Sequence, residues 1–209
     1  MKLTKQQLVG LNKIDRLNLI NSVTGIKPAN LIGTKSSVGQ ENLAIFSSVV
    51  HVGSNPGLIG FITRPTEEVR RDTYENILAS GVYTINHVPV DLFENAHYTS
   101  AKFSKEVSEF KACHFTPLYV NEFYAPFVKE SPIQIGMRLV EQVPIQLNGT
   151  ILMIGEIESL FVQDHIIEEG FHLNLEKALS SGISGLNSYY SLKKEAQFPY
   201  ARVEELPPF

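Results

Sequence analysis

Three arginine residues stand close to the start of a predicted helix. Arg64 ends a run of strand-forming residues, and Arg70 and Arg71 lie just before Thr73 in the first turn of that helix. A helix start presents unpaired backbone N–H groups and a partial positive charge, so guanidinium groups beside it form a receptor for a phosphate. The hydroxyl of Thr73 adds a further donor. The alternative is a solvent-exposed basic turn whose charge is balanced by the glutamates at 67–68.

Small polar residues follow an apolar run earlier in the chain. Ser47 and Ser48 follow the apolar run NLAIF, and Gly53 and Ser54 repeat the pattern a few residues later. Adjacent small side chains leave room for a flat ring to lie against the backbone, whose N–H groups can then bond to the ring edge. A β-bulge with exposed serines is the alternative. Together, a phosphate receptor and a ring seat predict an anionic, flat, partly apolar ligand.

The elements that must position these residues are mainly strands. Short β-rich runs separated by turn residues predict strands over 29–34, 42–52, 57–64 and 82–88, and longer ones over 131–146 and 149–167. Asn148-Gly149 is a strong hairpin signal between the long strands. Predicted helices cover residues 3–21, 70–80 with Asp72 as N-cap and Gly81 as end, two short segments within 91–110 with the second starting near 104, and 174–179.

This order of elements predicts the fold class. Strands that follow one another without regular helical crossovers favour an antiparallel sheet in meander order, and about seven such strands close most economically into a barrel. We therefore expect a mainly β fold with peripheral helices. It is predicted as one domain over residues 1–209, with an N-terminal helical extension over 1–22 and a C-terminal tail over 171–209.

Composition argues against several classes of protein. The net charge is -4 and no Lys/Arg cluster is longer than a pair, so a nucleic-acid-binding face is not expected. The single cysteine, Cys113, cannot form an internal disulfide and is expected to be buried and unreactive. No stretch approaches the ~20 apolar residues of a membrane span, and the N-terminus lacks the apolar core of a signal peptide. We expect a cytoplasmic protein with no membrane partner.

Several common motifs are missing from the sequence. It contains no glycine-rich dinucleotide motif, no P-loop, and no His-Glu-x-x-His or paired-cysteine motif, so no metal ion is expected. The six histidines never stand four residues apart on a predicted helix.

Six segments, in order, resemble the flavin reductase-like, FMN-binding split-barrel family, including its flavoredoxin-type members. They are LINSVTGIKPANLIGT leading to G-x-x-N-L-A-x-F-S-S, GSNPGLIGFITRP, RRDTYENI, HYTSAKFSKEVSEF, IGEIESLFVQDHII, and GLNSYY with FPYAR. No single segment is specific, but their shared order covers nearly the whole chain. Pro56-Gly57 departs from the Pro-Pro frequent in the family, which loosens that turn but leaves Pro56 in place.

The resemblance implies an antiparallel split β-barrel that forms a homodimer, with one noncovalently bound FMN per subunit near the dimer interface. Five residues resemble the segment that meets the isoalloxazine ring: Asn42, Ala44, Phe46, Ser47 and Ser48. Four resemble the ribityl-phosphate side: Arg64, Arg70, Arg71 and Thr73. His97 resembles a position that reaches the flavin or a nicotinamide, and a helix-surface histidine is the alternative.

The implied activity is an NAD(P)H-dependent flavin oxidoreductase. A bound FMN accepts hydride at N5 from NADH or NADPH, so no catalytic side chain is predicted. Reduced flavin would serve an oxygenase or a redox partner protein. One alternative is an FMN-binding electron carrier that is reduced by a partner protein and has no nicotinamide site, and another is a structural relative without a ligand. The aromatic segments NEFYAPF and GLNSYYSL would either line or close a slot beside the ring.

Overall fold

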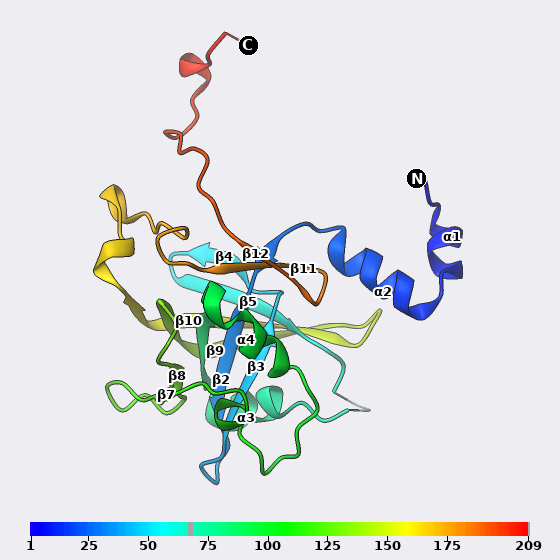
Figure 1. The fold of residues 1–209 in the computed structure, drawn as a ribbon, viewed down its shortest axis with the longest axis vertical. Helices are drawn as coiled ribbons and strands as arrows, with labels where there is room; N and C mark the ends of the chain where they lie inside the picture. Colours follow the sequence, from blue (N-terminus) through cyan, green and yellow to red (C-terminus); the bar gives the residue numbers. More distant parts are fainter. Residues whose placement is uncertain (67–68, 209) are drawn as a thin grey trace.

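The computed structural model describes residues 1–66 and 69–208. Within these residues, seven strands form one antiparallel sheet in the order β3-β2-β6-β9-β10-β5-β4 (Figure 1). The expected mainly β, antiparallel fold is therefore confirmed. The strands of this sheet are β2 (Asn30–Lys35), β3 (Glu41–Phe46), β4 (Val50–Ser54), β5 (Gly57–Thr63), β6 (Val82–His87), β9 (Ile133–Ile145) and β10 (Thr150–Val162).

The two outer strands of the sheet, β3 and β4, are consecutive in the chain. Only residues 47–49 separate them, so the two edges of the sheet must lie close together and the sheet curls into a barrel. These three residues are referred to below as the seam. Ser48 fastens the seam to β5, because its hydroxyl accepts from the Ile62 N–H (3.0 Å) and donates to the Ile62 carbonyl (3.3 Å).

The seam corrects one sequence prediction, and the sheet order corrects another. The strand predicted over 42–52 is two strands, because the Ser48 side chain takes up backbone groups of β5 and the chain there leaves the β2–β3 ladder. The predicted meander is wrong, since β6 lies between β2 and β9, and β5 pairs with β10.

The two longest strands, β9 and β10, have 13 residues each. They are joined by the predicted hairpin turn, in which Gly149 has a φ of 71° that favours glycine. Two small sheets complete the β structure: β1 (Lys27–Pro28) with β11 (Ser181–Ser184) and β12 (Ser188–Ser191), and β7 (Pro117–Leu118) with β8 (Phe127–Val128).

The N-terminal segment forms two helices where one was predicted, α1 (Lys5–Gly10) and α2 (Lys13–Ser22). Thr4 and Gln7 form a capping box at the start of α1. Asn12 starts a second helix because its side chain accepts from two backbone N–H groups, which breaks the first. Figure 1 shows both helices beside the barrel, and the residues after β12 leading away from it.

Helix α3 (Asp72–Ser80) packs against β2 and β3. Its predicted end is confirmed by Gly81, which has a φ of 74°. The predicted N-cap at Asp72 is wrong by one residue, because Arg71 is the N-cap. The Asp72 carboxylate instead pairs with the guanidinium of Arg70, with Oδ1 and Nε 3.0 Å apart.

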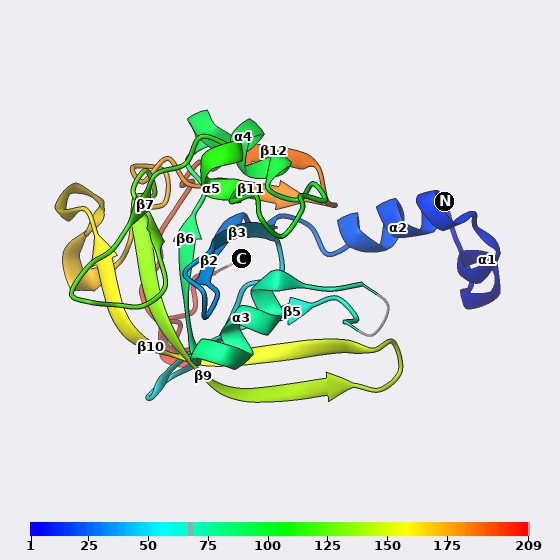
Figure 2. The ribbon, with the colours of Figure 1, turned by 90° about the horizontal axis from the view of Figure 1, so that it is seen from below.

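The remaining helices lie between or after the strands. The two short helices expected within 91–110 are α4 (Phe93–Tyr98), preceded by a 3-10 turn over Val90–Leu92, and α5 (Glu109–Ala112), which starts later than predicted. In Figure 2, α4 and α5 lie on the same side of the barrel as β11 and β12. The helix predicted over 174–179 is only a hydrogen-bonded turn from Asn174 to Ala178. Further 3-10 turns span Asp164–Ile166, Glu169–Phe171 and Val203–Glu205.

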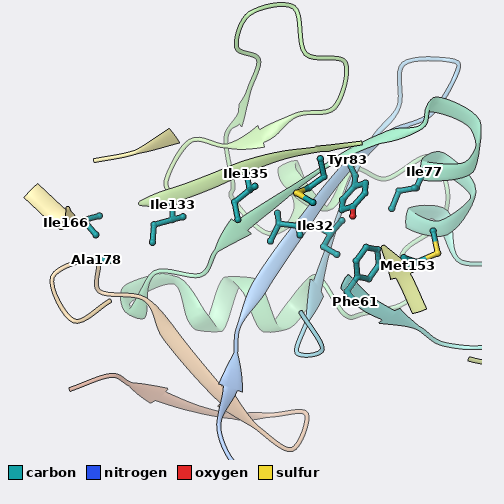
Figure 3. Close-up of a cluster of buried hydrophobic side chains, with 11 residues drawn as sticks. Ile32, Phe61, Ile77, Tyr83, Ile133, Ile135, Met153, Ile166 and Ala178 are labelled. Carbon is teal, nitrogen blue, oxygen red and sulfur yellow. The ribbon is translucent and has the colours of Figure 1, made fainter. Parts of the chain in front are cut away.

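Two apolar clusters pack on opposite faces of β2, as alternation along a strand requires. Ile32 belongs to the cluster inside the barrel, where Figure 3 shows Phe61, Tyr83 and Met153 close to it. Leu31 belongs to the outer cluster, together with the buried Cys113. No helix in residues 1–66 or 69–208 has the length and apolar character needed to span a membrane.

Candidate functional site

The start of α3 has backbone N–H groups that no bond within the helix uses. The first bond within the helix runs from the Glu75 N–H to the Arg71 carbonyl (3.0 Å), so the N–H groups of residues 72–74 have no acceptor in the helix. Arg71 stands at the N-cap, where its side chain offers a cation and no acceptor. The helix start therefore keeps its positive potential and suits an anion.

The Arg71 guanidinium reinforces this potential. Its Nε is buried and has no hydrogen-bond partner within the described part of the chain. Burial lowers the pKa of Arg71, and the nearby positive charge of Arg64 lowers it further. A buried donor beside a second cation is stabilised by an anion that accepts its hydrogen bond and offsets both charges.

Arg70 has a different environment from Arg71. Its Nε lies 3.0 Å from the Asp72 carboxylate and its Nη2 lies 2.7 Å from the Glu75 carboxylate. These ion pairs occupy the guanidinium and neutralise the acidic residues of the first turn. The glutamates at 67–68, considered above as balancing charges, lie outside the described residues.

Thr73 belongs to a buried network that joins α3 to the β2–β3 hairpin. The Asn42 amide donates to the Thr73 hydroxyl (3.0 Å) and to the Thr34 hydroxyl (3.3 Å). The Asn76 amide also donates to Thr34 (3.1 Å). This amide–hydroxyl network consists of Thr34, Asn42, Thr73 and Asn76, and it brings a residue assigned to the ring side into contact with one assigned to the phosphate side.

Sequence reasoning missed Thr34 and Asn76. Thr34 is the cross-strand partner of Asn42, and Asn76 stands three residues after Thr73 on α3. Polar residues that share a face of a strand or of a helix were a usable signal. That the two faces meet depends on where α3 packs, which the sequence does not show.

The other residues assigned to the ring side lie along β3 and the seam. Phe46 packs edge-to-face on Phe61, with ring centroids 5.1 Å apart, so its side chain is committed to the barrel core. Ser48 is bonded to β5 as described above. Ala44 and Ser47 are half-buried, and they leave the seam next to β3 lined by small side chains.

His97 lies on the other side of β3. Ala96 of helix α4 and Leu43 of β3 both belong to the outer apolar cluster. The side chain of Asn42, the residue before Leu43, points to the opposite face of β3. The Nδ1 of His97 is 3.2 Å from the hydroxyl of Tyr189. The structure therefore does not bring His97 together with the amide–hydroxyl network.

Both aromatic segments make contacts within the chain. The hydroxyls of Tyr119 and Tyr124 donate to the Glu41 carboxylate (2.9 Å) and the Ser36 carbonyl (2.7 Å). The Lys35 ammonium lies 4.5 and 4.2 Å from the centroids of these two rings. Tyr124 belongs to the NEFYAPF segment and Tyr119 lies two residues before it, so this part of the chain is fastened to the turn between β2 and β3 and to the strand residues beside that turn.

Tyr189 of the GLNSYYSL segment stacks on Phe93 of α4, with ring centroids 5.5 Å apart. Burial raises the pKa of its hydroxyl to about 12, so it is neutral near pH 7. Tyr124 and Tyr189, one residue from each segment, are therefore held by contacts within the chain.

The donor set fits a phosphate ester better than a metal ion. Around the α3 start, Arg71 Nε, the N–H groups of residues 72–74 and the Thr73 hydroxyl are donors. A phosphate supplies several acceptor oxygens, as this set requires. Across the residues that the structure describes, no three His, Cys, Asp or Glu side chains are placed to share a metal ion.

The fold has close counterparts among solved structures. A candidate flavin reductase with split barrel domain from Shewanella frigidimarina is 44% identical, with a TM-score of 0.92 over 96% of this chain and 100% of that chain. Nitrilotriacetate monooxygenase component B from Bacillus cereus is 19% identical, with a TM-score of 0.83 over 95% of this chain and 98% of that chain. Flavoredoxin of Desulfovibrio vulgaris is 21% identical, with a TM-score of 0.74 over 85% of this chain and 92% of that chain. The last two likenesses concern the fold alone. Residues 26–176 match the model of the flavin reductase like domain, and the chain therefore belongs to the flavin reductase-like family.

Proposed function

We propose that this protein binds FMN and catalyses flavin reduction by NADH or NADPH. The observation that carries the proposal is the buried Nε of Arg71, which has no hydrogen-bond partner among the described residues and lies at the start of α3, close to the charge of Arg64. Family membership supports a flavin, and this donor set supports a flavin that carries a phosphate. Riboflavin lacks the group that these donors require.

The residues divide into two groups in this proposal. Arg64, Arg71, Thr73 and the backbone of residues 72–74 hold the phosphate, and Arg70 keeps the neighbouring carboxylates neutralised. The flat ring lies along β3 and the seam, where Ala44, Ser47 and Ser48 are small enough to let it approach the backbone.

A bound FMN supplies the hydride acceptor, and the chain supplies orientation. Ser48 holds the seam on β5 and so fixes the surface on which the ring would rest. Phe46 and Phe61 stiffen that surface from inside the barrel. No side-chain acid or base is required for hydride transfer, which agrees with the lack of a catalytic motif in the sequence.

We further propose that the protein is a homodimer. β4 is an edge strand of the barrel and exposes Val50 and Val52, which are 52% and 44% accessible. An apolar edge next to the seam needs a cover, and a two-fold partner is the simplest one. Sedimentation at micromolar concentration tests this, and an FMN-loaded monomer contradicts it.

One observation favours a second function, that of an FMN-binding electron carrier. Tyr119, Tyr124 and Tyr189 make contacts within the chain, so they do not supply an open aromatic slot for a nicotinamide. In that case a partner protein reduces the flavin. In either function, the reduced flavin would pass electrons to another protein.

An anaerobic titration of the FMN-loaded protein with NADH and then NADPH separates the two functions. Bleaching of the flavin absorbance faster than that of free FMN supports the reductase and identifies the donor. A yellow protein that dithionite bleaches but neither nucleotide does supports the electron carrier. A purified protein that retains no flavin and binds none on addition contradicts both.

A further inference from the structure

We propose that Asn42 is a positioning residue that fixes the Thr73 hydroxyl as a donor toward the phosphate of FMN, an inference that rests on the proposed function. The family resemblance places Asn42 with the ring. The geometry points to the phosphate side instead, because the Asn42 amide contacts Thr73 at the start of α3.

The number of protons on the Asn42 amide shows which partner donates in its hydrogen bond with Thr73. Its Nδ2 has two protons, and the two contacts, to Thr73 (3.0 Å) and Thr34 (3.3 Å), use both of them. In each contact the hydroxyl oxygen is the acceptor. Thr73 therefore keeps its own proton to donate, in addition to the N–H groups of residues 72–74, which no bond within the helix uses.

The far side of the network holds Asn42 in place. Thr34 Oγ1 accepts from Asn42 and also from Asn76 (3.1 Å), so three elements, β2, β3 and α3, are tied together. Asn42 is 8% exposed, Asn76 7% and Thr34 0%, so water does not compete for these bonds. A buried amide whose Nδ2 makes two hydrogen bonds keeps one rotamer, and Thr73 is oriented accordingly.

Asn76 provides a matched control. Both asparagines are buried and both donate to Thr34, but of the two amides it is that of Asn42 that donates to the Thr73 hydroxyl. Loss of either amide removes packing and a bond to Thr34. Only loss of Asn42 leaves the Thr73 hydroxyl free to turn.

The experiment compares the dissociation constants of FMN and riboflavin for the full-length variants Asn42→Ala and Asn76→Ala, measured by quenching of flavin fluorescence. For Asn42→Ala we expect FMN binding to weaken by about 3- to 10-fold and riboflavin binding by less than about 2-fold, the effect of one misplaced hydrogen bond. For Asn76→Ala we expect a drop in melting temperature similar to that of Asn42→Ala, and a ratio of the FMN and riboflavin dissociation constants that equals that of the wild type.

A double-mutant cycle makes the assignment specific. In a Thr73→Val background, Asn42→Ala should no longer change the FMN-to-riboflavin ratio, because the hydroxyl that it positions is missing. If Asn42→Ala fails to fold, Asn42→Leu, which has nearly the same size, carries the same expectation.

Equal losses for both flavins in Asn42→Ala, or an equal change of ratio in Asn76→Ala, would overturn the inference. So would a full additional effect of Asn42→Ala in the Thr73→Val background. Failure of the proposed function gives a different result, since the wild-type protein would then bind FMN no better than riboflavin. If Arg71→Ala removes the FMN preference and Asn42→Ala keeps it, the phosphate site stands and the inference about Asn42 is wrong.

Discussion

Replacement of Arg71 by alanine should weaken FMN binding strongly and riboflavin binding hardly at all. Arg71 is the N-cap of α3, and its Nε is buried without a partner among the described residues. A charge-assisted bond to a phosphate oxygen contributes roughly 1.5 to 3 kcal/mol, which corresponds to about 10- to 150-fold in the dissociation constant. Because the substitution also relieves the repulsion from Arg64, we expect a value in the lower half of this range.

Arg70→Ala is the matched control for this prediction. The side chain of Arg70 is 45% exposed and its guanidinium is paired with Asp72 and Glu75. Exposed ion pairs contribute at most about 1 kcal/mol, so the loss of FMN affinity should stay below about 5-fold. The two arginines are adjacent in the sequence, and only their environments predict different outcomes.

Isothermal titration calorimetry with FMN and with riboflavin measures both effects on the same protein samples. A larger FMN loss in Arg70→Ala than in Arg71→Ala would refute the argument from burial. Equal losses for the two flavins in Arg71→Ala would place the phosphate elsewhere on the protein.

Three further predictions concern stability. Burial lowers the pKa of His87 from 6.5 to about 4, so folding favours the neutral form of the ring. The stability of the fold is therefore full above pH 6.5 and decreases as the pH falls from 6.5 to 4. Because the ring is partly accessible, we expect this loss to be at most about 3 kcal/mol. Urea unfolding at pH 7.5 and 5 should show this loss in the wild type and not in His87→Gln. Gly33→Ala should cost about 2 to 4 kcal/mol, because its Cβ would meet the Pro126 carbonyl and lie 2.6 Å from Thr84 Oγ1, and a tolerated substitution would contradict that packing. Ser48→Ala should cost about 1 to 2 kcal/mol in thermal unfolding by removing both bonds of the seam, and a neutral result would mean that the seam is held by other contacts.

Local chemistry was sufficient to predict several parts of the fold. The Asn148-Gly149 turn and the end of α3 at Gly81 each depend on one residue with a positive φ, and the sequence displays such residues directly. The N-cap of α3 was misassigned because a carboxylate next to Arg70 has two possible partners, a backbone N–H and a guanidinium, and only the packed structure selects one.

The candidate site was less predictable for a related reason. The residue types at 42–48 and 64–73 indicated a phosphate and a ring. The sequence did not show which of these residues lie near the phosphate and which lie near the ring. Asn42 and Thr73 are 31 positions apart, and their contact exists only because α3 packs against the β2–β3 hairpin. Long-range contacts of this kind depend on the whole fold and not on any local pattern.

The seam also has a consequence for how the chain folds. The β2–β3 and β4–β5 hairpins join residues close in sequence, yet no ladder pairs one hairpin with the other, and β6, β9 and β10 lie between them in the sheet order. The second partner of β5, besides β4, is β10, which ends at Val162, whereas β5 ends at Thr63. Pairing over such a separation is slow, so docking of the β9–β10 ribbon is expected to limit the folding rate. At about 5 to 20 residues per second, the ribosome needs several seconds after β5 to synthesise β10. During that time the edge of β5 is unpaired, and the nascent chain exposes an apolar strand that chaperones would have to protect.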